Sequence, residues 1–262
     1  MLNPGDGRTA RLLRHAHAGG FRFTLKHYDA TFRQPEHEHP HCVIDLVIGG
    51  YGNGRYGASH RESFPGSVEF FAARTGHTFA CGPVGIRTLH MSFDPSLAPP
   101  RTPGECPTPA AGPLCRALEV LLTQDAPDPW ALESLGLEAL GCLAEAGAAR
   151  TQRPPRWLAS MREQLLHDPS PPGIGELAES HGVDPSHVAR AFRTAYGESP
   201  GDTVRQARMA RAIARLAKDE PPSRAAAATG YADQAHMTRA FRSTVGMTPA
   251  RIRGVLARAR SL

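Results

Sequence analysis

The C-terminal half of the chain contains one helical unit twice, and this internal repeat restricts the fold more than any other feature of the sequence. The segment HVARAFR, which begins at His187, recurs as HMTRAFR beginning at His236, an offset of 49 residues. In both copies a glycine, a hydroxyl residue and a proline follow at the same spacing. Two copies in register predict two equivalent helical units in this half of the chain.

Each copy has the spacing of a helix-turn-helix motif. A small residue, Ala178 or Ala226, stands where the first helix must approach the second. The glycine four positions later, Gly182 or Gly230, suits a turn that needs a positive φ. One such motif is weak evidence for DNA binding, whereas two basic motifs in tandem are strong evidence.

The second helix of each motif is expected to begin after an aspartate N-cap, Asp184 or Asp233. An apolar pair at positions i and i+4 would be buried, and small or polar side chains would face outward. The outward positions are Ser186, Ala189, Arg190 and Arg193 in the first copy, and Ala235, Thr238, Arg239 and Arg242 in the second.

The charge is distributed unevenly along the chain. Residues 1–150 hold 13 Lys and Arg against 15 Asp and Glu, a net charge of −2, while residues 151–262 hold 17 against 10, a net charge of +7. A basic half joined to a nearly neutral half favours a C-terminal module that binds nucleic acid. A solvated basic helical surface would give the same balance.

The front half has the pattern of an antiparallel β-domain, a barrel or a sandwich. Gly- and Pro-containing turns separate its strand-like runs, which are residues 21–28, 42–50, 67–73 and 85–93. Seven prolines between residues 94 and 113 predict a loop or linker. Helices are expected over 114–123 and over 129–149, the second capped by Asp128, and the break TQRPP closes this half.

The two predicted helices carry more leucine than one small barrel needs to cover its face. We therefore expect segment 114–149 to mediate dimerisation, unless the leucines pack within the chain. The residues concerned are Leu118, Leu121, Leu122, Leu132, Leu135 and Leu143.

The repeat resembles the DNA-binding unit of the AraC/XylS family of bacterial transcription regulators. ATGYADQAHMTRAFRSTVGMTPARIR (228–253) follows the signature of that family, and IGELAESHGVDPSHVARAFRTAYGESPGDTVRQARMARA (174–212) resembles its first motif and connecting helix. The resemblance is specific over residues 156–253. The front half, from HEHPHCVIDLVIGG to PGSVEFFAARTGH, more loosely resembles the cupin-like sensor domain of the family.

The resemblance implies an α+β multidomain fold. An N-terminal antiparallel, cupin-like β-barrel with flanking helices would be joined to an all-α domain with two helix-turn-helix motifs. Residues 1–110 would sense an effector, 111–155 would form dimerisation helices and a linker, and 156–262 would bind DNA.

The resemblance also implies which side chains read DNA. The base-edge candidates are Ser186, His187 and Arg190 in the first motif, and Gln234, Ala235, Thr238 and Arg239 in the second. Arg193 and Arg242 would lie nearer the phosphates. Small Ala189 and Ala235 stand at positions that often carry polar readers in this family, so they would contact thymine methyl groups or nothing.

A histidine cluster in the front half is the candidate effector site. His37 and His39 would share one face of a strand and chelate an ion together with His77, in the order of the cupin metal motifs. The usual cupin glutamate is missing, and His39, His41 and Asp45 form a second register with aspartate in its place. A divalent transition metal, zinc or nickel, and a metal-free ligand pocket both remain open.

The leading interpretation is a cytoplasmic transcription regulator that is not an enzyme. Its partners would be double-stranded promoter DNA, a small-molecule or metal effector, RNA polymerase and a second copy of the chain. No apolar run approaches the roughly 18 residues of a membrane-spanning helix. The alternatives are a cupin metalloenzyme, of the isomerase or dioxygenase type, with a helical appendage, and a DNA-architectural protein without an effector.

Overall fold

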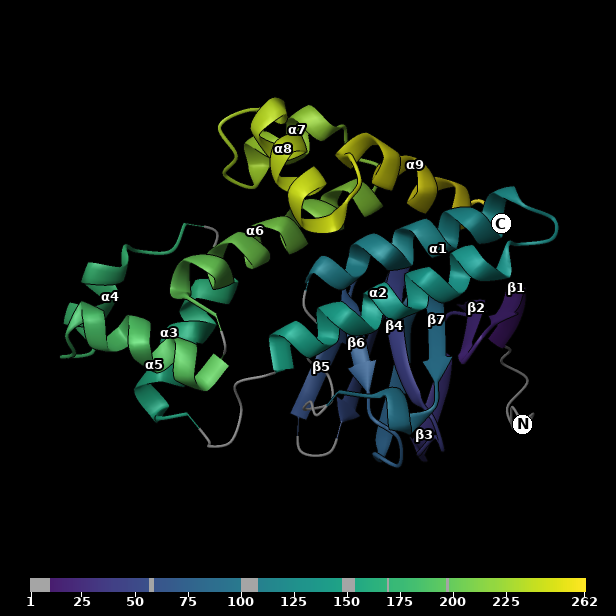
Figure 1. Cartoon of the computed structure of the whole chain (residues 1–262), viewed down its shortest axis with the longest axis horizontal. Coiled ribbons are helices and arrows are strands. Elements are labelled where there is room, and N and C mark those ends of the chain that lie inside the picture. Colours follow the sequence, from purple (N-terminus) through teal and green to yellow (C-terminus); the bar gives the residue numbers. More distant parts are fainter. Residues whose placement is uncertain (1–9, 57–58, 100–107, 148–153, 169, 197) are drawn as a thin grey trace.

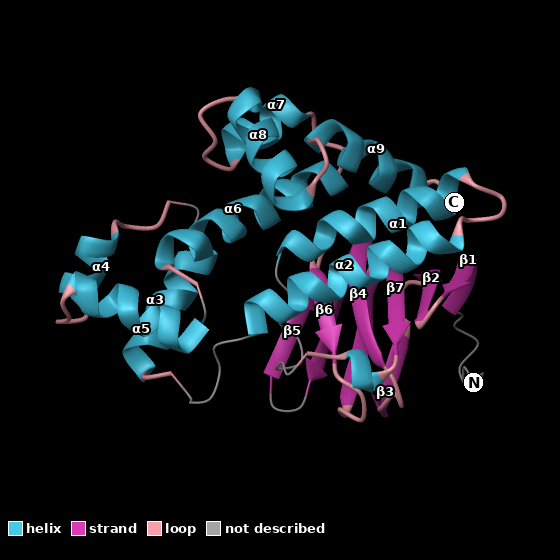
Figure 2. Cartoon of the chain, in the orientation of Figure 1, coloured by secondary structure: helices cyan, strands magenta, loops and turns pink. Residues whose placement is uncertain are grey.

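The computed structural model describes residues 10–56, 59–99, 108–147, 154–168, 170–196 and 198–262 (Figure 1). Strands are confined to the N-terminal part, two helices lie along the sheet, and the rest of the described chain is helical (Figure 2). This confirms the predicted α+β architecture. None of the described helices combines the length and apolarity needed to cross a membrane.

The described strands form one antiparallel sheet in the order β1-β2-β7-β4-β5, with β3 paired to β7 and β6 paired to β4. Its strands are β1 (Ala10–Ala18), β2 (Phe21–Tyr28), β3 (Arg33–His37), β4 (Cys42–Tyr56), β5 (Ser59–Ser63), β6 (Val68–Phe71) and β7 (His77–Phe93). The two longest strands, β4 and β7, pair along most of their length, and their register shifts twice, between Val47 and Gly49 and between Gly50 and Gly52. Such bulges bend a sheet and increase its twist, which helps it to enclose a cavity.

The sheet has an apolar outer face and a mixed inner face because successive side chains of a strand point to opposite sides. Phe23, Ile44 and Met91 belong to the main hydrophobic core together with leucines of the covering helices. These helices are α1 (Ala111–Thr123) and α2 (Pro129–Gly147), which run side by side over the sheet (Figure 1). Asp128 accepts a hydrogen bond from the backbone of Trp130 at 3.0 Å, as expected for the cap of α2.

The leucines that suggested dimerisation pack within the chain. Leu118, Leu121, Leu132 and Leu143 have no exposed surface, and Leu122 and Leu135 are partly buried against the same core. The expected surplus of leucine is therefore used to join the helices to the sheet. On α2, Trp130 and Leu137 are 78% and 55% exposed, so an α2-mediated dimer would have to use that face. Dimerisation stays a prediction.

The proline-rich segment is more regular than predicted where it is described. Short 3₁₀ turns span Pro95–Leu97 and Thr108–Ala110, and α1 begins at Ala111 with Pro113 in its first turn. Proline is tolerated there because the first amides of a helix have no partner within the helix. Residues 100–107 lie outside the described part of the chain.

The C-terminal region has seven helices among its described residues. They are α3 (Arg156–His167), α4 (Ile174–Ser180), α5 (Pro185–Tyr196), α6 (Pro200–Ala217), α7 (Pro222–Ala228), α8 (Gln234–Val245) and α9 (Pro249–Arg260). Helices α4 and α5 form the first motif, and α7 and α8 form the second. The connecting helix α6 has 18 residues and is therefore about 27 Å long.

The two motifs have different hydrophobic cores. The first motif packs with α3 in a separate cluster that includes Leu158, Leu177 and Phe192. The second motif shares the large cluster of the β-domain, in which Phe241 and Leu256 lie together with residues of the sheet and of α1. The second motif is therefore continuous in packing with the β-domain, whereas the first is attached through α6 and α3.

Helix α1 makes polar contacts with both α8 and α9. Arg116 donates a hydrogen bond of 3.0 Å to the carbonyl oxygen of Val245, at the end of α8. Glu119 lies 2.8 Å from Arg251 and 3.6 Å from Arg258, both on α9. Gly112 faces the backbone of Val245 so closely that a Cβ would overlap its carbonyl oxygen.

Replacing Gly112 by Ala should weaken this docking. The added methyl group has no room against a backbone carbonyl, and such overpacking costs about 1–3 kcal/mol, more than the gain in helix propensity. The matched control is Gly141→Ala on α2, where an added Cβ would meet nothing within 4 Å. Urea unfolding should show a lower free energy for Gly112→Ala only, and equal stability of the two variants would contradict the close approach.

Candidate functional site

The second helix of each motif begins as the sequence predicts. The Asp184 side chain accepts a hydrogen bond of 2.8 Å from the backbone of Ser186, and Asp233 accepts one of 2.6 Å from the backbone of His236. The preceding turns contain Gly182 and Gly230, with φ of 65° and 77°. The second helix of each motif, α5 or α8, is called its recognition helix below. Each recognition helix has a defined first turn, which fixes the direction of its outward side chains.

The apolar face of each recognition helix is buried, and the predicted reading face is open. Val188 and Phe192 on α5, and Met237 and Phe241 on α8, have no exposed surface. Of the nine predicted DNA-contacting residues, Thr238 is half-buried. The exposed ones are Ser186, His187, Arg190, Arg193, Gln234, Ala235, Arg239 and Arg242.

Several of these polar groups already have partners within the chain. The hydroxyl of Ser186 donates to Asp184, and that of Thr238 donates to the carbonyl of Gln234 at 2.8 Å. The His187 ring lies 5.7 Å from the Trp157 ring, measured between centroids. Hydroxyl oxygens still have acceptor capacity in such bonds.

The four arginines of the recognition helices differ from those at the docking surface. Arg190, Arg193, Arg239 and Arg242 form no ion pair with any residue that the structure describes, whereas Arg251 and Arg258 are held by Glu119. These arginines could instead brace the helix by pairing with a neighbouring acidic residue, but no such partner occurs among the described residues. The guanidinium groups stay available for phosphate or guanine, which present matching acceptors.

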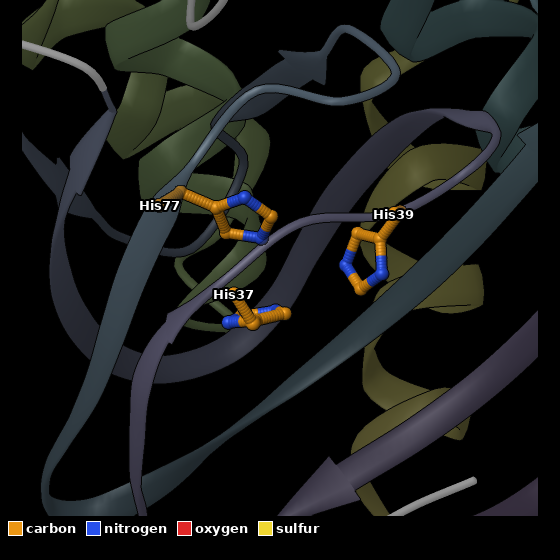
Figure 3. Close-up of side chains that lie close together, drawn as sticks. All are labelled: His37, His39 and His77. Atoms are coloured by element: carbon orange, nitrogen blue, oxygen red, sulfur yellow. The ribbon is translucent and has the colours of Figure 1, made fainter.

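The second candidate site is a pocket inside the β-domain. The imidazoles of His37 at the end of β3, of His39 in the loop that follows, and of His77 at the start of β7 surround one position (Figure 3). One ligand nitrogen from each lies within 4.8 Å of the others. The sheet register places His37 directly opposite His77. These three residues can hold a metal ion, and we call them the histidine triad.

Backbone carbonyl groups orient two imidazoles of the triad as potential ligands. Nδ1 of His37 lies 2.9 Å from the carbonyl of Pro35, and Nδ1 of His77 lies 2.9 Å from that of Thr75. A carbonyl only accepts, so each Nδ1 carries a hydrogen, and Nε2 is the nitrogen that a neutral ring would offer to a metal. Nε2 of His37 is buried without a partner among the described residues. This backbone support is typical of metal-binding histidines.

Burial also lowers the pKa of two triad members. The pKa of His39 falls to about 3, mainly through desolvation and then through the neighbouring His77 and His37. The pKa of His77 is lowered, again mainly by burial, although its bond to Thr75 opposes the shift. Both rings are therefore neutral at physiological pH, the protonation state that a metal requires.

The other two predicted ligands lie elsewhere. The ring of His41 stacks on that of His39 with 5.4 Å between centroids. Asp45 Oδ1 lies 2.7 Å from Nδ1 of His90 instead of facing the triad. Among the described residues the geometry thus assembles His37, His39 and His77, and not the register of His39, His41 and Asp45.

Several residues of the pocket carry no signal in the local sequence. They are His90, Glu69 and Thr88. All three line the same cavity as His39 and His77 of the triad. The signal lies in the pairing of strands, which places Asp45 opposite both His90 and Glu69. A local pattern does not reveal that pairing.

Replacing Arg190 or Arg239 by Ala should leave stability unchanged, because neither side chain makes an ion pair with a described residue. We expect a change within about 0.5 kcal/mol in the free energy of unfolding. Glu119→Ala is the contrasting variant, since it removes the partner of two arginines and should cost up to about 1 kcal/mol. A marked loss of thermal stability in Arg239→Ala would favour the bracing role instead.

Comparisons with known proteins agree with the arrangement of the helices. The family model described as a helix-turn-helix domain matches residues 177–254, a range that contains most of the first motif and all of the second. Among curated proteins none matches the chain.

Solved structures similar to the N-terminal region include cupins. A cupin superfamily protein from Desulfitobacterium hafniense is 15% identical, covering 36% of this chain and 84% of its own, with a TM-score of 0.30. KdgF from Halomonas sp. is 18% identical, covering 35% and 84%, also with a TM-score of 0.30. A variant of oxalate decarboxylase from Bacillus subtilis is 12% identical, covering 34% and 28%, again with a TM-score of 0.30.

The family match coincides with the two motifs that the repeat predicted and that the structure shows folded on either side of α6. The chain therefore carries a helix-turn-helix domain in residues 177–254, joined to an N-terminal antiparallel β-domain.

Proposed function

We propose that the protein is a sequence-specific transcription regulator controlled by a small molecule or metal bound in its N-terminal barrel. The observation that carries the proposal is the pair of equivalent recognition helices, whose exposed arginines have no ion-pair partner among the described residues. A buried, histidine-lined cavity in the same chain supports a sensing role. A second copy of the chain and RNA polymerase would be its protein partners at a promoter.

The two recognition helices would enter successive major-groove segments on one face of the duplex. Arg190 and Arg239 occupy equivalent positions, and each guanidinium can donate two hydrogen bonds to O6 and N7 of a guanine. Arg193 and Arg242 lie about one turn further along and would contact phosphates. Helix α6 would hold the two helices about one turn of DNA, ~34 Å, apart.

The remaining outward residues would refine the reading. Ser186, His187, Gln234 and Thr238 can exchange hydrogen bonds with base edges, and the methyl group of Ala235 suits a thymine methyl. These roles follow from their exposure on α5 and α8 and from the family resemblance.

Arg239→Ala should weaken the free energy of binding to the cognate site by about 1–3 kcal/mol and relax the preference at one base pair. Arg190→Ala should have the same effect. Arg242→Ala should instead weaken binding to all sequences alike and reduce the salt dependence. The measurement is fluorescence anisotropy on a site selected in vitro, with single-base variants at two salt concentrations.

Arg33→Ala is the control, because it removes one positive charge from an exposed position on β3, away from the helices. Its binding should equal that of the unmodified protein. An Arg239→Ala protein with unchanged base preference would refute the base-reading role.

We further propose zinc or nickel as the metal, held by the triad. Three neutral imidazoles suit either ion, and a site with three protein ligands leaves a position open for an oxygen or nitrogen of an effector. When bound, the ion would supply a Lewis-acidic anchor or would itself be the signal. A cupin metalloenzyme would be expected to add a carboxylate ligand, but Asp45 faces His90, and this geometry favours sensing.

Replacing His77 by Ala should abolish stoichiometric binding of Zn²⁺, since two imidazoles remain where three converged. His60→Ala is the matched control, because His60 is exposed on β5. Equilibrium dialysis followed by elemental analysis measures the bound metal. If the unmodified protein binds neither Zn²⁺ nor Ni²⁺ at stoichiometry, the metal version fails and an organic effector remains.

A further inference from the structure

A row of polar side chains crosses the barrel interior beside the triad. In the sheet register Thr24 on β2 lies opposite His90 on β7, His90 lies opposite Asp45 on β4, and Asp45 lies opposite Glu69 on β6. Directly paired residues point to the same face of a sheet, so the four side chains share the inner face. The metal proposal uses none of them.

Glu69 is the carboxylate of this row that has no basic side chain within ion-pair distance among the described residues. It is 8% exposed, and its hydrogen-bonding partners are the hydroxyl groups of Ser63, Ser67 and Tyr56. In contrast, Oδ1 of Asp45 lies 2.7 Å from Nδ1 of His90, and Asp45 also interacts electrostatically with Lys26. Glu69 forms no ion pair with a described residue, and the charge of Arg61 affects it less than that of Asp45 does. Burial raises the pKa of Glu69 to about 7.

The surrounding cavity suits a ligand that is apolar at one end and cationic at the other. No Arg or Lys occurs among the described residues that line it, while Val47, Phe71, Phe79 and Ile86 provide apolar wall. Thr88 also lines the cavity, is 4% exposed, and its hydroxyl has no partner among the described residues. A buried hydroxyl without a partner is uncommon in proteins and can serve a ligand.

We propose that the inner barrel binds a small organic cation whose ammonium group contacts the carboxylate of Glu69 and whose apolar body lies against Phe71 and Phe79. A cation would supply the charge that Glu69 lacks, whereas an anion would be repelled by both carboxyl groups of the row. A neutral polyol would satisfy the hydroxyl groups but would leave that charge uncompensated. The inference rests on the sensing function proposed above, because it names the chemical class of the effector.

The test uses three probes of nearly equal shape: benzylamine, benzyl alcohol and benzoate. Each is titrated into the full chain, free of added metal and at one ionic strength, by calorimetry and by thermal shift. We expect benzylamine to bind most tightly. Glu69→Gln keeps the shape of the side chain and removes its charge, and it should weaken benzylamine at least tenfold without affecting benzyl alcohol. Glu62→Gln, at an exposed position on β5, is the control and should change nothing.

The comparison of probes on the unmodified protein decides the class even if Glu69→Gln does not fold. On the unmodified protein, the proposal is overturned by equal affinity for alcohol and amine, by tighter binding of benzoate, or by no binding of any probe. It is also overturned if a folded Glu69→Gln protein binds benzylamine with unchanged affinity. Gel shifts on the selected DNA site separate this result from the proposed function. Specific DNA binding without amine binding refutes only the cationic class, and amine binding without specific DNA binding refutes only the regulator.

Discussion

The alternation of side chains along β4, β6 and β7 is the constraint on which the rest of the structure depends. Asp45 lies between Ile44 and Leu46, and Glu69 between Val68 and Phe70. Every second residue of these strands faces the cavity, and its neighbours enter the core under the helices. The same three strands thus build a mixed interior and an apolar docking face, and a register slip of one residue would exchange the two.

The docking face explains why the two motifs are held differently. Helices α1, α6 and α9 share the core of the sheet, so the second recognition helix has a fixed position relative to the cavity. The first motif has its own core and is linked through α6 and α3. Two motifs that share the repeated segment therefore differ in how they are attached to the β-domain, and tertiary packing, not the repeat, produces the difference.

Local sequence predicted those features that local interactions determine. The repeat located both motifs, the aspartate caps appeared at residues 184 and 233, and strand β2 has the predicted limits. The edge segments β1, β3 and β5 were not predicted as separate strands, because β3 and β5 are largely polar and β1 lacks a regular apolar alternation. Their conformation depends on pairing with distant strands.

The candidate site shows the same division. The triad could be proposed because HxH spacing is local and His77 follows a recognisable turn. Glu69 and His90 could not, since their role depends on which strands are neighbours. The leucines of α1 and α2 were visible in the sequence, but whether they cover the chain's own sheet or a second copy is a question of long-range packing.

Arg87 shows what this two-faced arrangement means for change over evolutionary time. Its neighbours Ile86 and Thr88 line the cavity, while its own guanidinium donates a 2.7 Å hydrogen bond to the carbonyl of Ala259 near the end of α9. Substitutions at positions 86 and 88 can alter what the cavity accepts while leaving position 87 in place. Inherited variation can therefore change the lining of the cavity and the attachment of the second motif independently, although both rest on one short stretch of backbone.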